Sequence, residues 1–438
     1  MMIKSIAILG AGESGVGAAL LGLKHGAKVF VSDFGRMDED VRQELSASSI
    51  DFEEGGHTFE KIVTYDYVVK SPGIPEKSDI IQKLRAAGKK IISEIEYASI
   101  FYRGIVIAVT GSNGKTTTSG LMYHVLKNAG YDVALGGNYG KSFARIVAER
   151  DYTYMVLEVS SFQLDDIDAF RPEIAVLLNI TPDHLDRYGY NMANYVDAKF
   201  KITKNQLAED YFIYNIDDEE IKNKLNSLQL KSECYAIKAG QYLNGIYSTD
   251  DDSRFELSIK GRHNLLNGMC VVAACRRLGL NERDIADGLS TFVNLPHRLE
   301  TCGIIEGVEF INDSKATNVD SVYYALDAME QPIVWIAGGT DKGNDYEVLL
   351  PLINEKVKAL ICLGVDNEKL KTFFQPHIST IVETTKVSEA VEWGLRFSQK
   401  GDLVLLSPAC ASFDLFKNYM DRGNQFKAAV AELSIKNQ

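Results

Sequence analysis

One stretch, IVIAVTGSNGKTTT at residues 105–118, constrains the fold of this chain more than any other. Its first five residues are apolar β-formers, which predict a buried strand and are too few to cross a membrane. A glycine turn follows, and then a helical run from Ser119 to Asn128. Strand, glycine turn and helix in this order predict an α/β sheet with a phosphate cradle. The N–H groups of such a turn and the positive end of the helix dipole face an anion.

The residue types in this turn indicate a nucleoside triphosphate as the ligand. Lys115 would reach the terminal phosphates, and the Thr116 hydroxyl would ligate Mg²⁺. The strict pattern has a glycine five residues before Gly114, where this chain has Val109. The alternative is a glycine-rich turn that binds nothing, which leaves the Lys-Thr pair unexplained. The predicted phosphate-binding residues are Gly111, Ser112, Asn113, Gly114, Lys115, Thr116 and Thr117.

Composition narrows the class of protein further. At 438 residues the chain is too long for one core, so two to four domains are expected. The net charge of −13 argues against a broad nucleic-acid surface. We expect no signal peptide, transit segment or membrane span. The six cysteines form no CxxC pair, so reduced thiols in a cytoplasmic enzyme are predicted rather than a zinc ribbon.

The N-terminal segment carries a second glycine motif. GAGESG at residues 10–15 follows the predicted strand 5–9, and Asp33 ends the next strand. This is a dinucleotide-binding fingerprint with an acid placed to hold a ribose hydroxyl, and an NAD-dependent dehydrogenase is the obvious alternative function. The unit is short, however, and the strand 67–70 ends in the rigid turn SPGIP. The motif could equally hold the diphosphate of a UDP-sugar, or no ligand.

Polar residues follow three predicted strands of the central part. Thr116 follows the first strand, Glu158 lies near the end of strand 154–159, and His184 comes after strand 174–179. Ligands collect at the carboxyl ends of strands in open α/β sheets. A hydroxyl, a carboxylate and an imidazole beside phosphates make a plausible Mg²⁺ shell, although a single histidine is often structural.

Lys199 lies inside the helical pattern that follows His184. An ammonium group repels Mg²⁺, so Lys199 fits this site only if it pairs with phosphate or is converted chemically to an anion. Farther along, Asn264 and Asn267 share a helix face from which amides could reach a purine or ribose. Helix capping would explain Asn264 equally well.

The C-terminal part again reads as a mostly parallel α/β sheet, entered through a hinge at residues 294–300. Three of its predicted strands end in the polar clusters 312–318, 338–343 and 407–414. Their lysines, Lys315 and Lys342, beside hydroxyl groups suit a small anionic substrate such as an amino acid. Three clusters at corresponding strand ends argue against ordinary turns.

Motifs along nearly the whole chain resemble those of the Mur ligase family. They are TGSNGKTTT, EVSSFQL, NITPDHLDRY, YxxAKxxI, HNLLN, LPHRLE, NDSKATN, GGTDKG and LSPACASFD. The resemblance implies an N-terminal Rossmann-like UDP-binding domain (1–94), a central P-loop ATPase-like domain (95–297) and a C-terminal Rossmann-like domain (298–438). NDSKATN and LSPACASFD discriminate best among sister ligases, and they resemble the branch that adds D-glutamate.

The resemblance implies the chemistry as well. ATP would phosphorylate the carboxylate of UDP-N-acetylmuramoyl-L-alanine, and the amine of D-glutamate would displace phosphate from the acyl phosphate. This reaction of peptidoglycan synthesis would use two Mg²⁺ sites in a cytoplasmic, monomeric enzyme with no nucleic-acid partner and no membrane span.

The resemblance also assigns roles to residues. Catalysis falls to Lys115, His184 and Lys199, the last as a carbamate. The Mg²⁺ ligands are Thr116, Glu158, His184 and Lys199. Further ATP contacts are Asn264, Asn267, Arg298, Asp313 and Lys315. The UDP-substrate contacts are Ser14, Asp33, Gly73, Asn138 and Ser160. The D-glutamate contacts are Thr317, Lys342, Ser412 and Tyr419, where Tyr419 replaces a phenylalanine of some relatives.

Overall fold

The computed structural model describes residues 3–238, 242–243, 246–248, 254–259, 261–341 and 343–437. The chain forms two compact units. Unit 1 comprises Met1–Glu256 and Leu266–Phe292, and unit 2 comprises Leu257–Leu265 and Val293–Gln438. Among the described residues, no helix combines the length and the apolar character that a membrane crossing requires.

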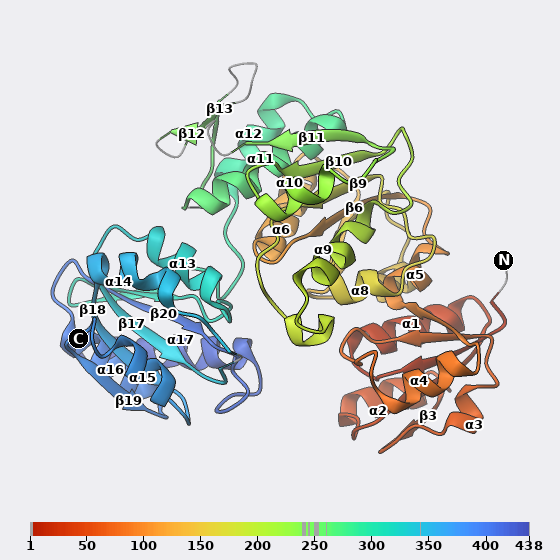
Figure 1. Cartoon of the computed structure of the whole chain (residues 1–438), viewed down its shortest axis with the longest axis horizontal. Helices are drawn as coiled ribbons and strands as arrows, with labels where there is room; N and C mark the ends of the chain where they lie inside the picture. Colours follow the sequence, from red (N-terminus) through yellow and green to blue (C-terminus); the bar gives the residue numbers. More distant parts are fainter. Residues whose placement is uncertain are drawn as a thin grey trace. The chain divides into compact units, whose positions relative to one another are not determined.

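The first sheet of unit 1 has five parallel strands in the order β3-β2-β1-β4-β5. Helices lie on its two faces (Figure 1). Since β1 has β2 on one side and β4 on the other, the strand order reverses at β1, and a crevice opens there at the carboxyl ends. The elements are β1 (Ser5–Leu9), α1 (Glu13–Lys24), β2 (Lys28–Asp33), α2 (Glu39–Ala47), β3 (Asp51–Glu54), α3 (Phe59–Ile62), β4 (Tyr67–Lys70), α4 (Asp79–Ala86), β5 (Lys90–Ser93) and α5 (Glu94–Ser99).

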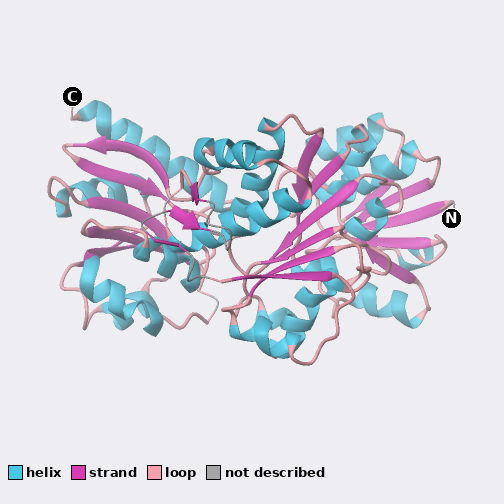
Figure 2. Ribbon diagram, turned by 90° about the horizontal axis from the view of Figure 1, so that it is seen from above, coloured by secondary structure: helices cyan, strands magenta, loops and turns pink. Residues whose placement is uncertain are grey.

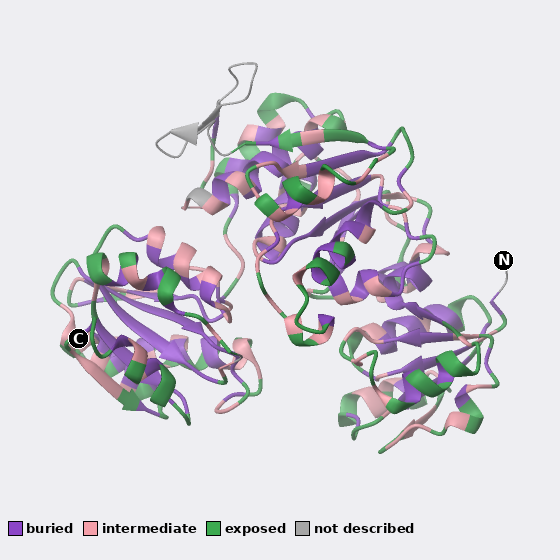
Figure 3. Cartoon of the chain, viewed as in Figure 1, coloured by how far each residue is buried: buried purple, intermediate pink, exposed green. Residues whose placement is uncertain are grey.

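The second sheet of unit 1 has six parallel strands in the order β11-β10-β9-β6-β8-β7. Its central strands are buried apolar runs, as expected for a parallel sheet covered on both faces (Figure 3). The elements are β6 (Ile105–Thr110), α6 (Lys115–Asn128), β7 (Val133–Gly137), α7 (Phe143–Glu149), β8 (Tyr154–Glu158), α8 (Ser161–Asp165), β9 (Ile174–Leu177), the 3₁₀ helix η1 (Leu185–Tyr188), α9 (Met192–Phe200), the 3₁₀ helix η2 (Lys201–Thr203), β10 (Tyr211–Asn215), α10 (Glu219–Leu225), β11 (Glu233–Ile237) and α12 (Glu282–Thr291).

One continuous apolar core joins the two sheets of unit 1. Polar contacts cross the same junction: Glu13 of α1 accepts hydrogen bonds from the backbone N–H of Ser142 and from Arg145. Glu96 of α5 accepts from the N–H groups of residues 168–170. The first sheet and its crevice are therefore fixed relative to the second sheet.

A short antiparallel sheet and a long helix follow β11. The elements are β12 (Tyr242–Leu243), β13 (Ile246–Ser248), β14 (Arg254–Glu256) and α11 (Arg262–Arg277). The run of three aspartates at residues 250–252, which predicts a solvated hairpin turn, lies outside the described residues.

Unit 2 contains a third sheet in the order β15-β16-β20-β17-β18-β19, in which only the edge pair β15-β16 is antiparallel. Helices cover both of its faces (Figure 2), and each face has its own apolar core. The elements are β15 (Glu300–Ile305), β16 (Val308–Asn312), α13 (Val319–Asp327), β17 (Ile333–Gly338), the 3₁₀ helix η4 (Glu347–Leu349), α14 (Leu350–Lys356), β18 (Val357–Leu363), α15 (Glu368–Phe374), β19 (Ile381–Thr384), α16 (Val387–Phe397), β20 (Leu403–Ala409) and α17 (Tyr419–Lys436).

The predicted fold class, α/β with mostly parallel sheets, is confirmed. Several elements differ from the sequence prediction, and two of them have a clear physical reason. Helix α6 begins at Lys115 rather than Ser119, because Gly114 is left-handed (φ 84°) and the helix starts directly after it. Strand β15 was not predicted, since its run ETCGII mixes polar and apolar residues and contains a bulge. The predicted domain limits at residues 94 and 297 remain predictions.

Candidate active site

The phosphate loop lies at the carboxyl end of β6, between that strand and α6. The Lys115 ammonium donates to the carbonyl oxygens of Gly111 and Ser112, both at 2.8 Å. A Cβ at Gly114 would lie 2.7 Å from Oδ1 of Asn267, so only glycine fits between the loop and α11. Asn267, predicted to contact ATP, therefore packs directly on this loop.

Hydrogen bonds tie the loop to the segment after β9. Ser112 Oγ donates to the carbonyl of Thr181 at 2.9 Å and lies 3.0 Å from the hydroxyl of Tyr195. The N–H of Asn113 donates to Oδ1 of Asn179 at 2.8 Å. The tail of β9 is consequently held beside the loop, and it carries Asp183 and His184 with it.

Glu158 ends β8 and His184 follows β9, the two strands that flank β6, and both residues lie at the carboxyl end of the sheet near the phosphate loop. Glu158 lies opposite Val109 in the β6–β8 register, is buried, and accepts a hydrogen bond of 2.8 Å from Nδ2 of Asn138. His184 has a left-handed backbone (φ 52°) at the start of η1, and its ring packs edge-on against Phe162. The fold thus brings the start of α6, Glu158 and His184 together at the carboxyl ends of three adjacent strands. The roles of these residues remain predictions.

Lys199 is the least expected group at this edge because it is a lysine with 1% exposure. Its Nζ lies 4.5 Å from the ring centre of Tyr195, and no described carboxylate forms an ion pair with it. Burial and the neighbouring Lys115 lower the pKa of Lys199 well below its usual value, although Asp183 opposes the shift. Burial therefore shifts the amine of Lys199 toward its neutral form, compared with a lysine in water.

The donors at this edge match the preference of Mg²⁺ for oxygen ligands only in part. The Thr116 hydroxyl and Glu158 carboxylate are buried oxygen donors. Among the described residues, no cluster of three His, Cys, Asp or Glu side chains forms a metal site. A carbamate on Lys199 would add oxygen donors beside Lys115, which makes the predicted shell chemically consistent.

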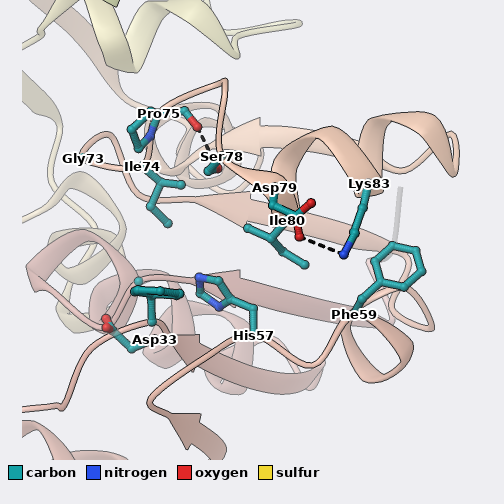
Figure 4. Close-up of a pocket in the computed structure, with 12 residues that line it drawn as sticks. Asp33, His57, Phe59, Gly73, Ile74, Pro75, Ser78, Asp79, Ile80 and Lys83 are labelled. Carbon is teal, nitrogen blue, oxygen red and sulfur yellow. Dashed lines mark hydrogen bonds and ion pairs between the residues drawn. The ribbon is translucent and has the colours of Figure 1, made fainter.

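A pocket of about 560 Å³ lies in the crevice of the first sheet (Figure 4). Gly10, Asp33 and Gly73 line it. Asp33 accepts hydrogen bonds from the N–H groups of Ala11 and Gly35, at 2.6 and 2.8 Å, so it ties the glycine turn to the loop after β2. Gly10 is left-handed (φ 91°), and a Cβ there would meet Ser71 Oγ at 2.7 Å.

The other residues predicted to contact the UDP substrate lie on nearby helices and loops of unit 1. Ser14 lies in the first turn of α1 and is partly exposed. Ser160 caps α8 through a capping box with Gln163. Asn138 follows β7 and is held by Glu158.

In unit 2, the three predicted polar clusters do lie together at strand ends. Ser407 Oγ donates to Oδ2 of Asp313 at 2.9 Å, and burial raises the pKa of Asp313 to about 7. Lys315 lies over the ring of Tyr419, with Nζ 3.9 Å from its centre. Ser412 is buried after β20.

The remaining C-terminal candidates divide between surface and interior. Thr317 and Arg298 are partly exposed, and Asn264 is buried near the start of α11. Lys342 lies outside the described residues.

Comparison with known proteins identifies the family. Residues 5–80 match the MurD N-terminal domain, residues 109–275 the Mur ligase middle domain, and residues 297–410 the Mur ligase glutamate ligase domain. A UDP-N-acetylmuramoylalanine–D-glutamate ligase of Christiangramia forsetii is 49% identical over 99% of this chain and all of that protein. The chain belongs to the Mur ligase family. It is therefore a ligase, as the motifs predicted.

Other relatives of this Mur ligase carry the same name. The protein of Bacteroides fragilis is 47% identical over 98% of this chain and all of that protein, and the Salinibacter ruber protein is 38% identical over 97% of each.

Solved Mur ligases share the fold. MurC of Thermotoga maritima covers 98% of this chain and 100% of its own, with a TM-score of 0.64 and 19% identity. MurF of the same organism, solved in complex with ADP, covers 94% and 96%, with a TM-score of 0.64 and 16% identity.

Sequence reasoning missed two arginines of this ligase that organise its strand-end loops. Arg422 of α17 is buried and donates to Ser314, Gly338 and Cys410, one residue from each strand-end cluster. The sequence does indicate that Arg422 is buried, because its spacing places it on the same inward face of α17 as Phe426, Val430 and Leu433.

Arg187 is the second missed residue. Its guanidinium donates to the carbonyls of Pro72, Gly73 and Ile74, at 3.2–3.3 Å, and stacks on Phe162. Only its place in NITPDHLDRY could have suggested a role, since the partners lie more than a hundred residues away.

Proposed function

We propose that this Mur ligase joins D-glutamate to UDP-N-acetylmuramoyl-L-alanine in peptidoglycan synthesis, with ATP as the energy source. The full-length relatives that carry the name of that ligase support the choice of substrates. The observation that carries the chemistry is the meeting of the phosphate loop, Glu158, His184 and the buried Lys199 at one sheet edge. A dehydrogenase would leave this edge unexplained.

In the proposed reaction, a carboxylate oxygen of the acceptor attacks the γ-phosphorus of ATP, and the bond to the bridging oxygen of ADP breaks. The D-glutamate amine then attacks the acyl phosphate, loses a proton and expels phosphate, which leaves an amide. Phosphoryl transfer of this kind is catalysed mainly by positioning and by charge stabilisation. The loop N–H groups and Lys115 would hold the phosphates, with Asn264, Asn267, Arg298, Asp313 and Lys315 as further ATP contacts.

Thr116, Glu158, His184 and Lys199 would hold Mg²⁺ here, at two sites. When bound, Mg²⁺ neutralises phosphate charge and orients the oxygens. The neutral amine of Lys199 would bond to the carbon of CO₂ and release one proton, and the resulting carbamate would be an anion. The low pKa of Lys199 supports this modification because only the unprotonated amine can react.

The two remaining substrates would use the residues that the sequence predicts for them. Ser14, Asp33, Gly73, Asn138 and Ser160 would bind the UDP substrate, and the crevice of the first sheet has the size of a small-molecule site. Thr317, Lys342, Ser412 and Tyr419 would bind D-glutamate. We further propose a cytoplasmic monomer, consistent with six free cysteines.

Phosphate release tests the proposal directly. The full chain is incubated with ATP, Mg²⁺, UDP-N-acetylmuramoyl-L-alanine and each member of an amino-acid panel that includes both glutamate enantiomers. We expect release only when acceptor and D-glutamate are both present, with one amide formed per phosphate. Release without the amino acid, or with another amino acid alone, would refute the proposal.

A further inference from the structure

The pocket of the first sheet contains a histidine whose role the sequence does not suggest. Figure 4 shows Asp33 and His57 on one side of the pocket and Ile74, Pro75 and Ile80 on the other. The second side also carries Ser78, Asp79 and Lys83. Apolar side chains opposite Asp33 and His57 suit a flat ring that carries hydrogen-bonding groups on its edge. The hydrogen-bonding state of His57 then decides which ring edge the pocket accepts.

A relay of hydrogen bonds fixes that state. Ser32 Oγ lies 2.8 Å from Oε1 of Glu53 and 2.7 Å from Nδ1 of His57. Burial opposes ionisation of Glu53, but hydrogen bonds from Thr58 and Ser32 outweigh it and lower the pKa of Glu53. An ionised carboxylate only accepts hydrogen bonds, so the single hydroxyl proton of Ser32 goes to Glu53. Nδ1 of His57 must therefore carry a proton and donate it to Ser32.

The other ring nitrogen of His57 is consequently an acceptor. Burial lowers the pKa of His57, although Asp33 and Glu53 oppose the shift, so the ring is neutral at pH 7. A neutral imidazole protonated at Nδ1 has a lone pair at Nε2. Within the described ranges, no protein donor is hydrogen-bonded to this nitrogen, and the residue lines the pocket.

We propose that His57 selects the nucleobase of the acceptor substrate, because its Nε2 accepts the N3–H of a uracil ring. Cytosine has a lone pair at N3 and would meet Nε2 with a second acceptor. Ser32 is the positioning residue, since it holds His57 in the required tautomer. The inference rests on the proposed function, which supplies a uridine nucleotide as the substrate.

Calorimetric titration of the full chain with UDP and with CDP at pH 7.5 tests the selection. We expect UDP to bind about tenfold to a hundredfold more tightly than CDP, the range of one buried unpaired acceptor. His57→Gln should bring the ratio of the CDP and UDP dissociation constants near one, because an amide can present either a donor or an acceptor to the base. Ser32→Ala should also lower the ratio, because the released ring can change tautomer. His25→Gln, on a histidine stacked against Phe101, should leave the ratio unchanged.

Nitrogen-15 chemical shifts of the histidine ring give a readout that needs no variant. We expect His57 to be protonated at Nδ1 in the wild-type chain, with the Nε2 resonance shifting when UDP is added. Protonation at Nε2 would overturn the inference, as would equal binding of UDP and CDP by the wild type or an unchanged ratio in His57→Gln. If neither nucleotide binds, the proposed function is refuted along with the role of His57. If both nucleotides bind equally well, only the role of His57 is refuted.

Discussion

Burial changes the pKa of single ionisable residues in this ligase. Lys199 and Glu94 are both ionisable groups with almost no exposure. Removal from water disfavours the charged form, so the pKa of a lysine falls and the pKa of a carboxyl group rises. The amine of Lys199 is thereby shifted toward its neutral form, whereas Glu94 holds a proton that the unfolded chain does not hold at neutral pH.

Lys199→Ala is expected to lower kcat by about a hundredfold or more, because the proposed carbamate can no longer hold Mg²⁺. Short carboxylates such as acetate should restore part of the activity by occupying the vacated space. Steady-state phosphate release with and without added carboxylate measures both effects. Lys127→Ala, on the exposed side of α6, is the matched control. Turnover like that of the wild type in Lys199→Ala would refute the carbamate.

Glu94→Gln is expected to stabilise the protein at neutral and alkaline pH. Burial raises the pKa of Glu94 to about 8 from an ordinary value of 4.5. Between these values the folded chain keeps a proton that the unfolded chain releases, so the free energy of unfolding falls as pH rises. This fall is at most about 1.4 kcal/mol per pH unit for one group and ends above pH 8.

Urea unfolding at pH 5, 7 and 9 measures this effect. The difference between Glu94→Gln and wild type should grow from pH 5 to pH 9, while Glu149→Gln, on an exposed residue, should show no such trend. A difference that is constant with pH would show that Glu94 is ionised in the folded state.

At the scale of elements, η1 links two sites that the sequence places far apart. It begins beside His184, and its Arg187 holds the loop at residues 72–74, which lines the pocket of the first sheet. The same guanidinium stacks on Phe162, whose ring edge meets His184. The position of His184 therefore depends on a contact with the neighbouring sheet.

Arg187→Lys is expected to lower kcat/KM for the UDP substrate by about tenfold or more, because one ammonium cannot reach three carbonyls or stack as a guanidinium does. The fall should appear in both KM and kcat, since the loop and His184 are disturbed together. Initial rates over a range of UDP-substrate concentrations separate the two. Arg150→Lys, an exposed arginine that stacks on Tyr152, is the control. An effect on thermal stability without any kinetic change would assign Arg187 a structural role only.

At the scale of the whole molecule, the apolar cores of the two units determine which cysteine thiols are exposed to solvent. Unit 1 has an apolar core that spans two sheets and a further core within the first sheet, and unit 2 has a core on each face of its sheet. The cysteines are free, and four of the six are buried. Cys234 is the exposed thiol, so a reagent reaches it before the others, although partial burial raises its pKa.

Titration with an aromatic disulfide reagent is expected to give one fast-reacting thiol in the native protein, assigned to Cys234. The partly buried Cys302 should react slowly, and the remaining four only after denaturation. Cys234→Ser should remove the fast phase without changing the others. Four or more fast thiols in the native state would contradict the cores described above.

The sequence alone determined the fold class, the family and the strand ends where polar residues gather. Apolar strand runs and glycine turns are local patterns, and they dictate local backbone geometry. The phosphate loop is the clearest case, since Lys115 begins α6 directly after the left-handed Gly114.

Only the tertiary structure decided which side chains meet and what state they hold. Arg187, Arg422 and the Ser32–Glu53–His57 relay depend on hydrogen bonds between strands or loops distant in the chain, which no periodicity encodes. Likewise, the sequence specifies a lysine at position 199, but the lowered pKa of its amine results from burial beside Lys115. Desolvation and directional hydrogen bonding depend on three-dimensional surroundings, and these exist only once the sheets have packed.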